Sequence, residues 1–472
     1  MEINPQKARF GYYPTVWPNE HTDQWRTHTV LDAGLPKNFK PAELAVNYVD
    51  VDIPVWGYTR DRNQIFTTGG SPAFISEYTK MIIAGSQTPV GASQPRGDGP
   101  SNGAHRVNDG AQERRHIPIV AKIDPPTMKK EVLELPYGTT VNYTGGLLMH
   151  ANGYVYAVAR SVLYKIDPAS MKIAAHKELP WVGSGAQQFF TTYNGMQVTA
   201  SGDLIVKAFY LPDSTVPGVM LLVNPDDLAS LDVREAEVSG ARMTVEQVDE
   251  EKAYLYILTA ATSTRYLITA DHKFKHDHKW LSRYITEGST QASSSVFFGN
   301  QIAFSNNTSP VSTTPMKLFS QPIDNPPSML TPQTAFRQDN AGINFFMIGG
   351  DPFLTNSVVV FDPINRYVAM HHLTQGGTME PRWERQYKMS ASPALVPDRD
   401  LLYIDDFDYN KGRDYFLVVR LSTGEELARV ELPAKEPTVG CIFVGMNQDV
   451  FMLSSETGEA TGYVSRIHVG QQ

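Results

Sequence analysis

Short apolar runs, each followed by turn residues, make up most of the chain. Residues 154–158 and 162–166 are typical: both are β-rich runs, and a short turn separates them. No amphipathic helix of three turns competes with such runs anywhere in the sequence. The pattern therefore predicts an all-β protein built from short strands.

The turn after the second of these runs belongs to a repeated motif. Residues 123–129 read Ile-Asp-Pro-Pro-Thr-Met-Lys, and residues 166–172, 43 positions later, read Ile-Asp-Pro-Ala-Ser-Met-Lys. Asp at such a turn bonds its own backbone and Pro fixes φ, so each copy predicts a hairpin. Weaker copies follow, and their turn residues are Asn224, Asp271, Asp362 and Ser422.

The spacing of these turns indicates the architecture. Successive turns lie 43, 57, 47, 91 and 60 residues apart, and the gap of 91 leaves room for a further unit near Ile323-Asp324. Short strands at a period of roughly 40 to 60 residues are typical of β-propeller blades, each a four-stranded sheet. We expect a β-propeller with eight blades favoured and seven as the alternative.

The two ends of the chain predict how the ring closes. Residues 438–444, 449–454 and 463–469 supply only three strands, whereas residues 42–51 could add the missing outer strand and leave no free edge. Residues 42–472 then form a single propeller domain with a long loop insertion at 84–116. Residues 1–41 form an N-terminal arm, rich in aromatic residues and prolines, that lies over the ring or reaches a partner subunit and so offers a route to an oligomer.

The repeated motif resembles the repeats of the YVTN-type and quinoprotein-like β-propellers, over about residues 118–470. The resemblance implies the propeller fold. Quinoprotein alcohol dehydrogenases carry a tryptophan a few residues past this turn in most blades, whereas residues 129–135 and 172–179 contain none. The likeness therefore does not extend to bound pyrroloquinoline quinone, and we expect that no cofactor is required.

Composition narrows the function classes. The 472 residues include 41 Lys and Arg against 50 Asp and Glu, a net charge of −9 that argues against nucleic acid as partner. The single cysteine, Cys441, excludes an intramolecular disulfide and any multi-cysteine metal site. No apolar stretch approaches the ~20 residues of a membrane helix, and the first residues lack the apolar core of a signal peptide. A cytoplasmic location is therefore the default expectation. It is only a default, because a leader that had been trimmed would leave no trace in the sequence.

Candidate chemistry gathers in loops that we expect on one face of the ring, at the mouth of the channel. In a chain with only 19% charged residues, residues 380–387 are the densest cluster of ionisable and aromatic side chains. Arg can keep a neighbouring carboxylate ionised and can hold a substrate carboxylate in a bidentate way. A salt-bridged, solvated loop is the alternative. We expect catalytic roles for Arg60, Tyr143, Arg382, Glu384, Arg385, Tyr387 and His116, and substrate contacts from Trp56, Tyr58, Arg62, Asn142 and His105.

Residues 84–116 form a glycine-rich stretch with almost no large apolar residue. A loop of that length in a compact domain is usually a lid, a binding loop or disorder. As a lid it would bring His105 or His116 to a ligand, and histidine exchanges protons readily near neutral pH.

A possible calcium site lies between two predicted strands. Asp406, Asp408, Asn410 and Asp414 stand at relative positions 1, 3, 5 and 9, which suits a cation that binds six to eight oxygens. The run resembles the calcium hairpins of integrin-type propellers, although it has Gly412 at position 7. The alternative is a plain hairpin, and any calcium here would be structural.

Two functions of different classes follow from these features. The first is an enzyme acting on a small carboxylate- or carbonyl-containing molecule by acid–base and electrostatic catalysis, as a lyase, hydratase, isomerase or hydrolase. The alternative is a propeller that serves as a binding or scaffold protein, which would be favoured if the arginines of residues 380–387 pair with their neighbours. A quinone- or metal-dependent oxidoreductase is a third, weaker hypothesis.

Overall fold

The structure is a computed structural model. It describes residues 8–50, 55–61, 64–69, 119–135, 144–159, 161–182, 191–210, 216–237, 239, 241–259, 261–284, 291–292, 295–307, 315–338, 348–362, 365–389, 391–434, 442–455 and 462–470. These residues are almost entirely strands and turns, with two short 3-10 helices, η2 (Pro41–Glu43) and η4 (Pro397–Arg399). The all-β prediction is confirmed.

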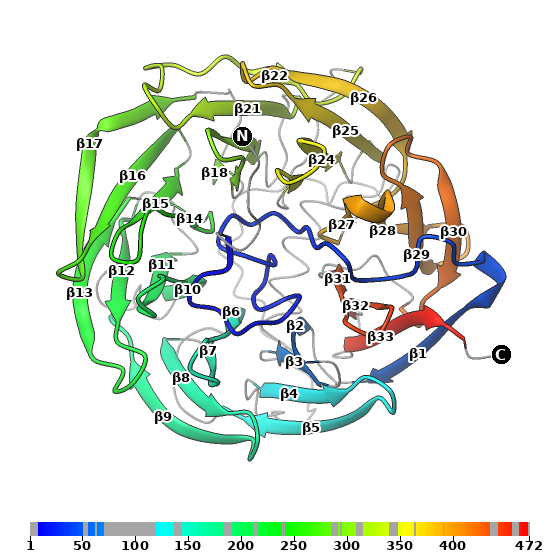
Figure 1. Ribbon diagram of the computed structural model, residues 1–472, viewed down its shortest axis with the longest axis horizontal. Coiled ribbons are helices and arrows are strands. Elements are labelled where there is room, and N and C mark those ends of the chain that lie inside the picture. The colour runs from blue at the N-terminus through cyan, green and yellow to red at the C-terminus, as the bar shows by residue number, and fades with distance from the viewer. Residues whose placement is uncertain are drawn as a thin grey trace, which may run out of the picture.

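Eight antiparallel sheets follow one another around a ring in the described part of the chain (Figure 1). The first contains β2 (Val55–Asp61), β3 (Gln64–Gly69), β4 (Ile119–Asp124) and β5 (Lys129–Glu134). The second contains β6 (Thr144–Met149), β7 (Val155–Ala159), β8 (Val162–Asp167) and β9 (Lys172–Glu178). The third contains β10 (Thr191–Val198), β11 (Leu204–Tyr210), β12 (Gly218–Val223) and β13 (Ser230–Ala236). The fourth contains β14 (Thr244–Gln247), β15 (Ala253–Leu258), β16 (Thr262–Thr269) and β17 (Lys273–Arg283).

The remaining four sheets complete the ring. The fifth contains β18 (Gln291–Ala292), β19 (Val296–Phe297), β20 (Gln301–Asn307), β21 (Lys317–Pro322) and β22 (Gln333–Thr334). The sixth contains β23 (Gly349–Asp351), β24 (Ser357–Asp362), β25 (Tyr367–Leu373) and β26 (Met379–Gln386). The seventh contains β27 (Ala394–Val396), β28 (Leu401–Asp408), β29 (Arg413–Arg420) and β30 (Glu426–Glu431). The eighth contains β31 (Ile442–Val444), β32 (Asp449–Ser455), β33 (Gly462–Val469) and β1 (Leu44–Asp50).

The propeller prediction is therefore confirmed, and the sheets have the favoured number. The predicted closure is also found, because β1 pairs with β33 from Leu44 opposite Val469 to Asp50 opposite Tyr463. The hidden unit near Ile323-Asp324 is the turn between β21 and β22. The N-terminal strand thus removes the edge that the last three strands would otherwise expose.

Burial explains why each sheet orders its strands this way. Strands in the middle of a sheet, such as β7, β8 and β24, are buried along almost their whole length, because neighbouring sheets cover both of their faces. Outer strands such as β9 alternate between exposed and half-buried positions. Continuous apolar runs therefore form the middle strands, and alternating runs form the rim in Figure 1.

The repeated motif forms the turn between the third and fourth strands of a sheet. Asp167 accepts hydrogen bonds from the Ala169 backbone N–H at 3.0 Å and from the Ser170 hydroxyl at 2.6 Å. The methionine of each copy, Met128 or Met171, has a positive φ of 53° or 49°. The conserved local geometry confirms that the motif predicts a hairpin.

The prediction for the turn at Asp362 is wrong. Asp362 ends β24, so its turn joins the second and third strands of the sixth sheet rather than the third and fourth. The turn between the third and fourth strands follows Leu373 and contains Gly377, at φ 85°. The strand after Asp362, β25, is therefore the third strand of the sheet and not the outermost one as predicted, and β26 takes the outermost place.

The N-terminal arm lies in the middle of the ring, where Figure 1 shows it crossing between the inner strands. Its backbone bonds to several sheets in turn: Val245 N–H donates to Gln24 O at 3.0 Å, Gly350 N–H to Thr27 O at 2.8 Å and Leu395 N–H to His28 O at 2.8 Å. Residues 17–30 are buried throughout. Of the two expected positions, the arm takes the one on its own propeller, and we call residues 8–35 the plug.

Candidate functional site

The ionisable cluster at residues 380–387 is not at the channel. Arg382, Glu384 and Arg385 lie on β26, the outermost strand of the sixth sheet, and Tyr387 follows directly after it (Figure 1). The prediction that these residues line the channel mouth is wrong, because it assumed that the Asp362 turn leads into an outer strand. The strand that follows the Asp362 turn is β25, the third strand of the sheet. The outermost strand, β26, comes after it and contains the cluster.

The side chains of this cluster bond to one another and to adjacent strands. Arg382 Nη2 lies 3.5 Å from Glu380 Oε2, and both side chains are about half exposed, at 49% and 52%. Arg385 Nη2 donates to Thr423 O at 2.6 Å, and Glu384 Oε2 accepts from the Arg337 backbone N–H at 2.8 Å. These are surface pairs, which generally contribute about 0 to 1 kcal/mol each.

The remaining candidates divide into two groups. Trp56, Tyr58 and Arg60 belong to β2, the innermost strand of the first sheet, and their roles stay predictions. Residues whose role stays a prediction because they lie outside the described residues are Arg62, His105, His116, Asn142 and Tyr143, together with the loop insertion 84–116.

The predicted calcium residues do not converge. In the β28–β29 hairpin, Asp414 stands opposite Phe407, whereas Asp406 and Asp408 alternate onto the other face of the sheet. Asp406 already accepts from the Lys388 N–H at 2.6 Å and from Arg429 Nη1 at 2.8 Å. Asp408 accepts from the Asn410 N–H at 2.9 Å, as an ordinary turn residue does. Across the described ranges no three His, Cys, Asp or Glu side chains are grouped so as to hold a metal ion.

A second ionisable cluster, which the sequence reasoning missed, occupies the middle of the ring. It consists of plug residues together with one residue just before β14, and all are at most 8% exposed: Glu20, His21, Asp23, Arg26, His28 and Arg242. We call these six residues the channel cluster. Five ionisable side chains within residues 20–28 were a visible signal, comparable to that of residues 380–387, but no repeat or strand pattern connected the arm to the channel.

Glu20 is the hub of the channel cluster. Arg242 donates to both carboxylate oxygens, from Nη2 at 2.7 Å and from Nε at 3.1 Å, and Arg26 Nη2 lies 3.4 Å from Oε2. His21 Nε2 is also 3.3 Å from Oε2. Bidentate arginine pairs of this kind fix geometry as well as charge. The plug is thus tied to the fourth sheet by a buried ion pair.

A chain of histidines leads away from this carboxylate. His21 Nδ1 bonds to His28 Nε2, and His28 Nδ1 donates to Pro393 O at 3.1 Å. Because His28 uses Nδ1–H for that carbonyl, its Nε2 accepts from His21. Burial, with a smaller contribution from Arg26, lowers the pKa of His28 to about 3, so this imidazole is neutral at ordinary pH.

Asp23 is the other perturbed group. Burial raises the pKa of its carboxyl to about 6, although Arg9 and hydrogen bonds from Thr27 act in the opposite direction. The Thr27 hydroxyl donates to Asp23 Oδ2 at 2.7 Å, and the Thr27 N–H donates to Oδ1 at 3.2 Å. A carboxyl with this pKa exchanges its proton near neutral pH, which an ordinary Asp does not.

The plug also carries buried polar atoms without a hydrogen-bond partner among the described residues. They include Trp17 Nε1, Thr22 Oγ1, Gln24 Oε1 and Trp25 Nε1. Buried donors and acceptors are nearly always bonded in native proteins, to water if not to protein. These atoms are therefore the donors and acceptors of the plug that the described protein atoms leave to water.

Comparison with known proteins identifies the architecture. A scan of protein families finds no match, and no curated protein sequence matches the chain. Quinohemoprotein alcohol dehydrogenase from Comamonas testosteroni has a similar structure, with a TM-score of 0.59 and 10% identity over 99% of this chain and 82% of that one. The likeness is one of fold. A quinohemoprotein alcohol dehydrogenase of Pseudomonas putida HK5 gives 0.58 at 9% identity over 97% and 81%, and the Dos1 propeller gives 0.55 at 8% over 91% and 96%. The expected resemblance to quinoprotein-like propellers is confirmed at that level, and identities this low carry no activity to this chain. Among the described residues, no helix has the length and apolar character needed to span a membrane.

Proposed function

We propose that this propeller is an enzyme that acts on a small carboxylate- or carbonyl-containing molecule in its central channel, by acid–base and electrostatic catalysis. The observation that carries the proposal is the channel cluster, which puts two arginines, two histidines and two carboxylates in the middle of the ring. Perturbed ionisable groups gathered at a propeller axis are candidates for function, because burial that shifts a pKa is how active sites prepare acids and bases.

The arrangement suits proton transfer. His21 donates from Nδ1 to the neutral His28, so its Nε2, which lies beside the Glu20 carboxylate, can take a proton from a substrate and then return it. Asp23, with a pKa of about 6, supplies a second group that is active near neutral pH. Arg26 and Arg242 supply positive charge for an anionic substrate or for a developing oxyanion. Because the cluster is buried, a neighbouring segment must move to admit the substrate.

Turnover of a substrate panel tests this proposal. Wild type is incubated with hydroxy acids, unsaturated acids, 2-oxo acids, lactones and esters, and conversion is followed by NMR. We expect His21→Asn and Asp23→Asn to lower turnover of any accepted substrate by about 100-fold or more. Arg382→Ala and Glu384→Gln on β26 are matched controls that should leave it unchanged. Turnover that survives both plug substitutions, or that depends on the β26 residues, contradicts the proposal.

A binding or scaffold role is the second candidate. The pairing of Arg382 and Arg385 with adjacent groups on the outer surface favours it over an enzyme that uses those arginines. The same panel discriminates between the two roles. A protein that converts none of the panel, while hydrogen exchange in the plug stays unaffected by every compound, supports the binding role.

A further inference from the structure

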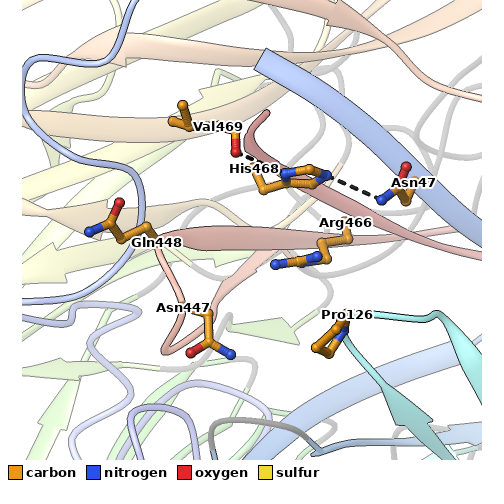
Figure 2. A pocket seen from close by; sticks show the side chains of 7 residues that line it. All are labelled: Asn47, Pro126, Asn447, Gln448, Arg466, His468 and Val469. Carbon is orange, nitrogen blue, oxygen red and sulfur yellow. Dashed lines mark hydrogen bonds between the residues drawn. The ribbon is translucent and has the colours of Figure 1, made fainter. Parts of the chain in front are cut away.

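A cavity of about 720 Å³ lies where the ring closes (Figure 2). Strands β33 and β1 border it on one side, the turn between β31 and β32 on another, and Pro126 of the β4–β5 turn lies across from them. It therefore spans the boundary between the eighth sheet and the first. Its lining is Asn47, Pro126, Asn447, Gln448, Arg466, His468 and Val469.

Arg466 is held in this cavity by a buried partner. Its Nε donates to Asp449 Oδ2 at 2.8 Å, and the Asp449 side chain is only 1% exposed. In the described part of the chain, neither terminal nitrogen of Arg466 makes a hydrogen bond. The guanidinium is thus fixed through one edge, and its terminal edge is directed toward the space that Figure 2 shows beside Asn447 and Pro126.

His468 lies two residues further along β33, so it is on the same face of the strand as Arg466. Its Nδ1 donates to Val469 O at 3.1 Å, and its Nε2 accepts from Asn47 Nδ2 at 3.2 Å (Figure 2). This bond orients the Asn47 amide across the pair of strands that closes the ring. No acidic side chain is among the lining residues, so no carboxylate of the lining repels an anion there.

We propose that this seam cavity binds a small organic carboxylate. The planar edge of Arg466 matches a carboxylate with two parallel hydrogen bonds, and the side-chain amides of Asn47 and Gln448 donate to the lone pairs that those bonds leave open on the same oxygens. Asp449 already neutralises one unit of charge, which makes the recognition depend on this geometry more than on net attraction. The site lies outside the channel cluster and does not depend on the proposed enzymatic function.

Binding here acts on the closure of the ring. The ligand contacts β1, β33 and the first sheet together, so it binds the closed ring and not the unfolded chain. A ligand with that preference stabilises the folded chain by RT ln(1 + L/Kd), where L is the free ligand concentration, so the unfolding temperature keeps rising with ligand concentration. Thermal stability is thus a readout of this site that needs no substrate or activity.

Malonate, succinate and citrate, titrated against the full chain at matched ionic strength, test the proposal by calorimetry and thermal unfolding. We expect at least one to bind and to raise the unfolding temperature. Arg466→Lys should weaken binding by about tenfold or more, because lysine cannot make the bidentate contact. Asn47→Ala should weaken it several-fold. Tyr48→Ser is the matched control, since Tyr48 lies on the other face of β1 and should not change the affinity.

Three outcomes overturn the proposal. The first is an absence of binding by all three carboxylates. The second is equal binding of inorganic phosphate or of glucose, which would indicate a general anion or polyol site. The third is an unchanged affinity in both the Arg466→Lys and Asn47→Ala variants. If Arg466→Lys does not fold, Asn447→Ala replaces it, because Asn447 lines the cavity and the alanine variant keeps the backbone N–H that bonds to Asp449.

Discussion

Buried ionisable side chains in the plug make the folding free energy of this protein depend on pH in two opposite directions. The pKa of His28 is lowered to about 3, so folding favours the neutral imidazole. The pKa of Asp23 is raised to about 6, so folding favours the neutral carboxyl. Each shift changes the number of protons bound on folding and therefore the slope of stability against pH.

His28→Gln should remove part of the acid sensitivity. Unfolded His28 takes up a proton below a pKa of about 6.5, whereas the folded residue does not until about 3, so stability is full above pH 6.5 and falls as the pH drops toward 3. Between pH 7 and pH 4.5, this one group should lower the free energy of unfolding of wild type by about 3 kcal/mol. Urea unfolding at both pH values measures the loss, which should be smaller by that amount in the variant. His176→Gln on β9 is the control, and an equal loss in His28→Gln and wild type would refute the role of His28.

Asp23→Asn should have the opposite effect. The raised pKa means that the folded protein holds a proton between about pH 4 and 6 that the unfolded chain has released. Stability from this group is therefore present below pH 4 and lost as the pH rises through 6, by about 3 kcal/mol. The asparagine variant lacks that decline, so the difference in unfolding free energy between variant and wild type should shift in favour of the variant from pH 4 to pH 7. A difference that is constant with pH would contradict this expectation.

At the scale of strands and turns, local chemistry predicted which segments form hairpins but not where each hairpin lies in its sheet. Asp167 and Asp362 both end an apolar strand and both accept hydrogen bonds from the turn that follows. The place of each turn depends on how many strands of its sheet come before it: β6 and β7 precede β8, whereas only β23 precedes β24. The error displaced Arg382 and Glu384 from the rim to the channel, which is why the predicted site failed although the fold prediction held.

One glycine turn shows what tertiary contact adds to local conformation. Gly424 has φ 70°, and a Cβ there would lie 2.6 Å from Trp383 Cδ2 on the neighbouring sheet. Gly153 also has a positive φ, of 86°, but a Cβ there would meet nothing within 4 Å. We expect Gly153→Ala to lower the free energy of unfolding by about 1 kcal/mol through backbone strain alone. Gly424→Ala should lower it by at least about 1 to 2 kcal/mol more, because its Cβ also clashes with Trp383. Chemical denaturation of both variants measures the difference, and equal costs would show that Trp383 moves aside freely.

At the scale of the whole molecule, the N-terminal 50 residues do two separate things. The plug fills the middle of the ring, where Trp17, Val30 and Leu35 join the largest apolar core cluster. Strand β1 then closes the eighth sheet against β33. The closing strand was predictable because three strands in the last unit required a fourth. The plug was not, because its contacts with Val245, Gly350 and Leu395 connect residues more than 200 positions apart in the sequence.

Two truncations separate these roles. A chain that starts at residue 41 loses the plug but keeps β1, so its ring should stay closed and monomeric, with an unfolding temperature lowered by the loss of several buried side chains, each contributing about 1.5 to 3 kcal/mol. A chain that starts at residue 52 also loses β1, which leaves β33 as an unpaired outer edge that can pair with another copy. Size-exclusion chromatography with light scattering should therefore find association only in the shorter chain. Association of both chains to the same extent would mean that the plug, rather than β1, keeps the ring closed, because the two truncated chains differ only in residues 41–51.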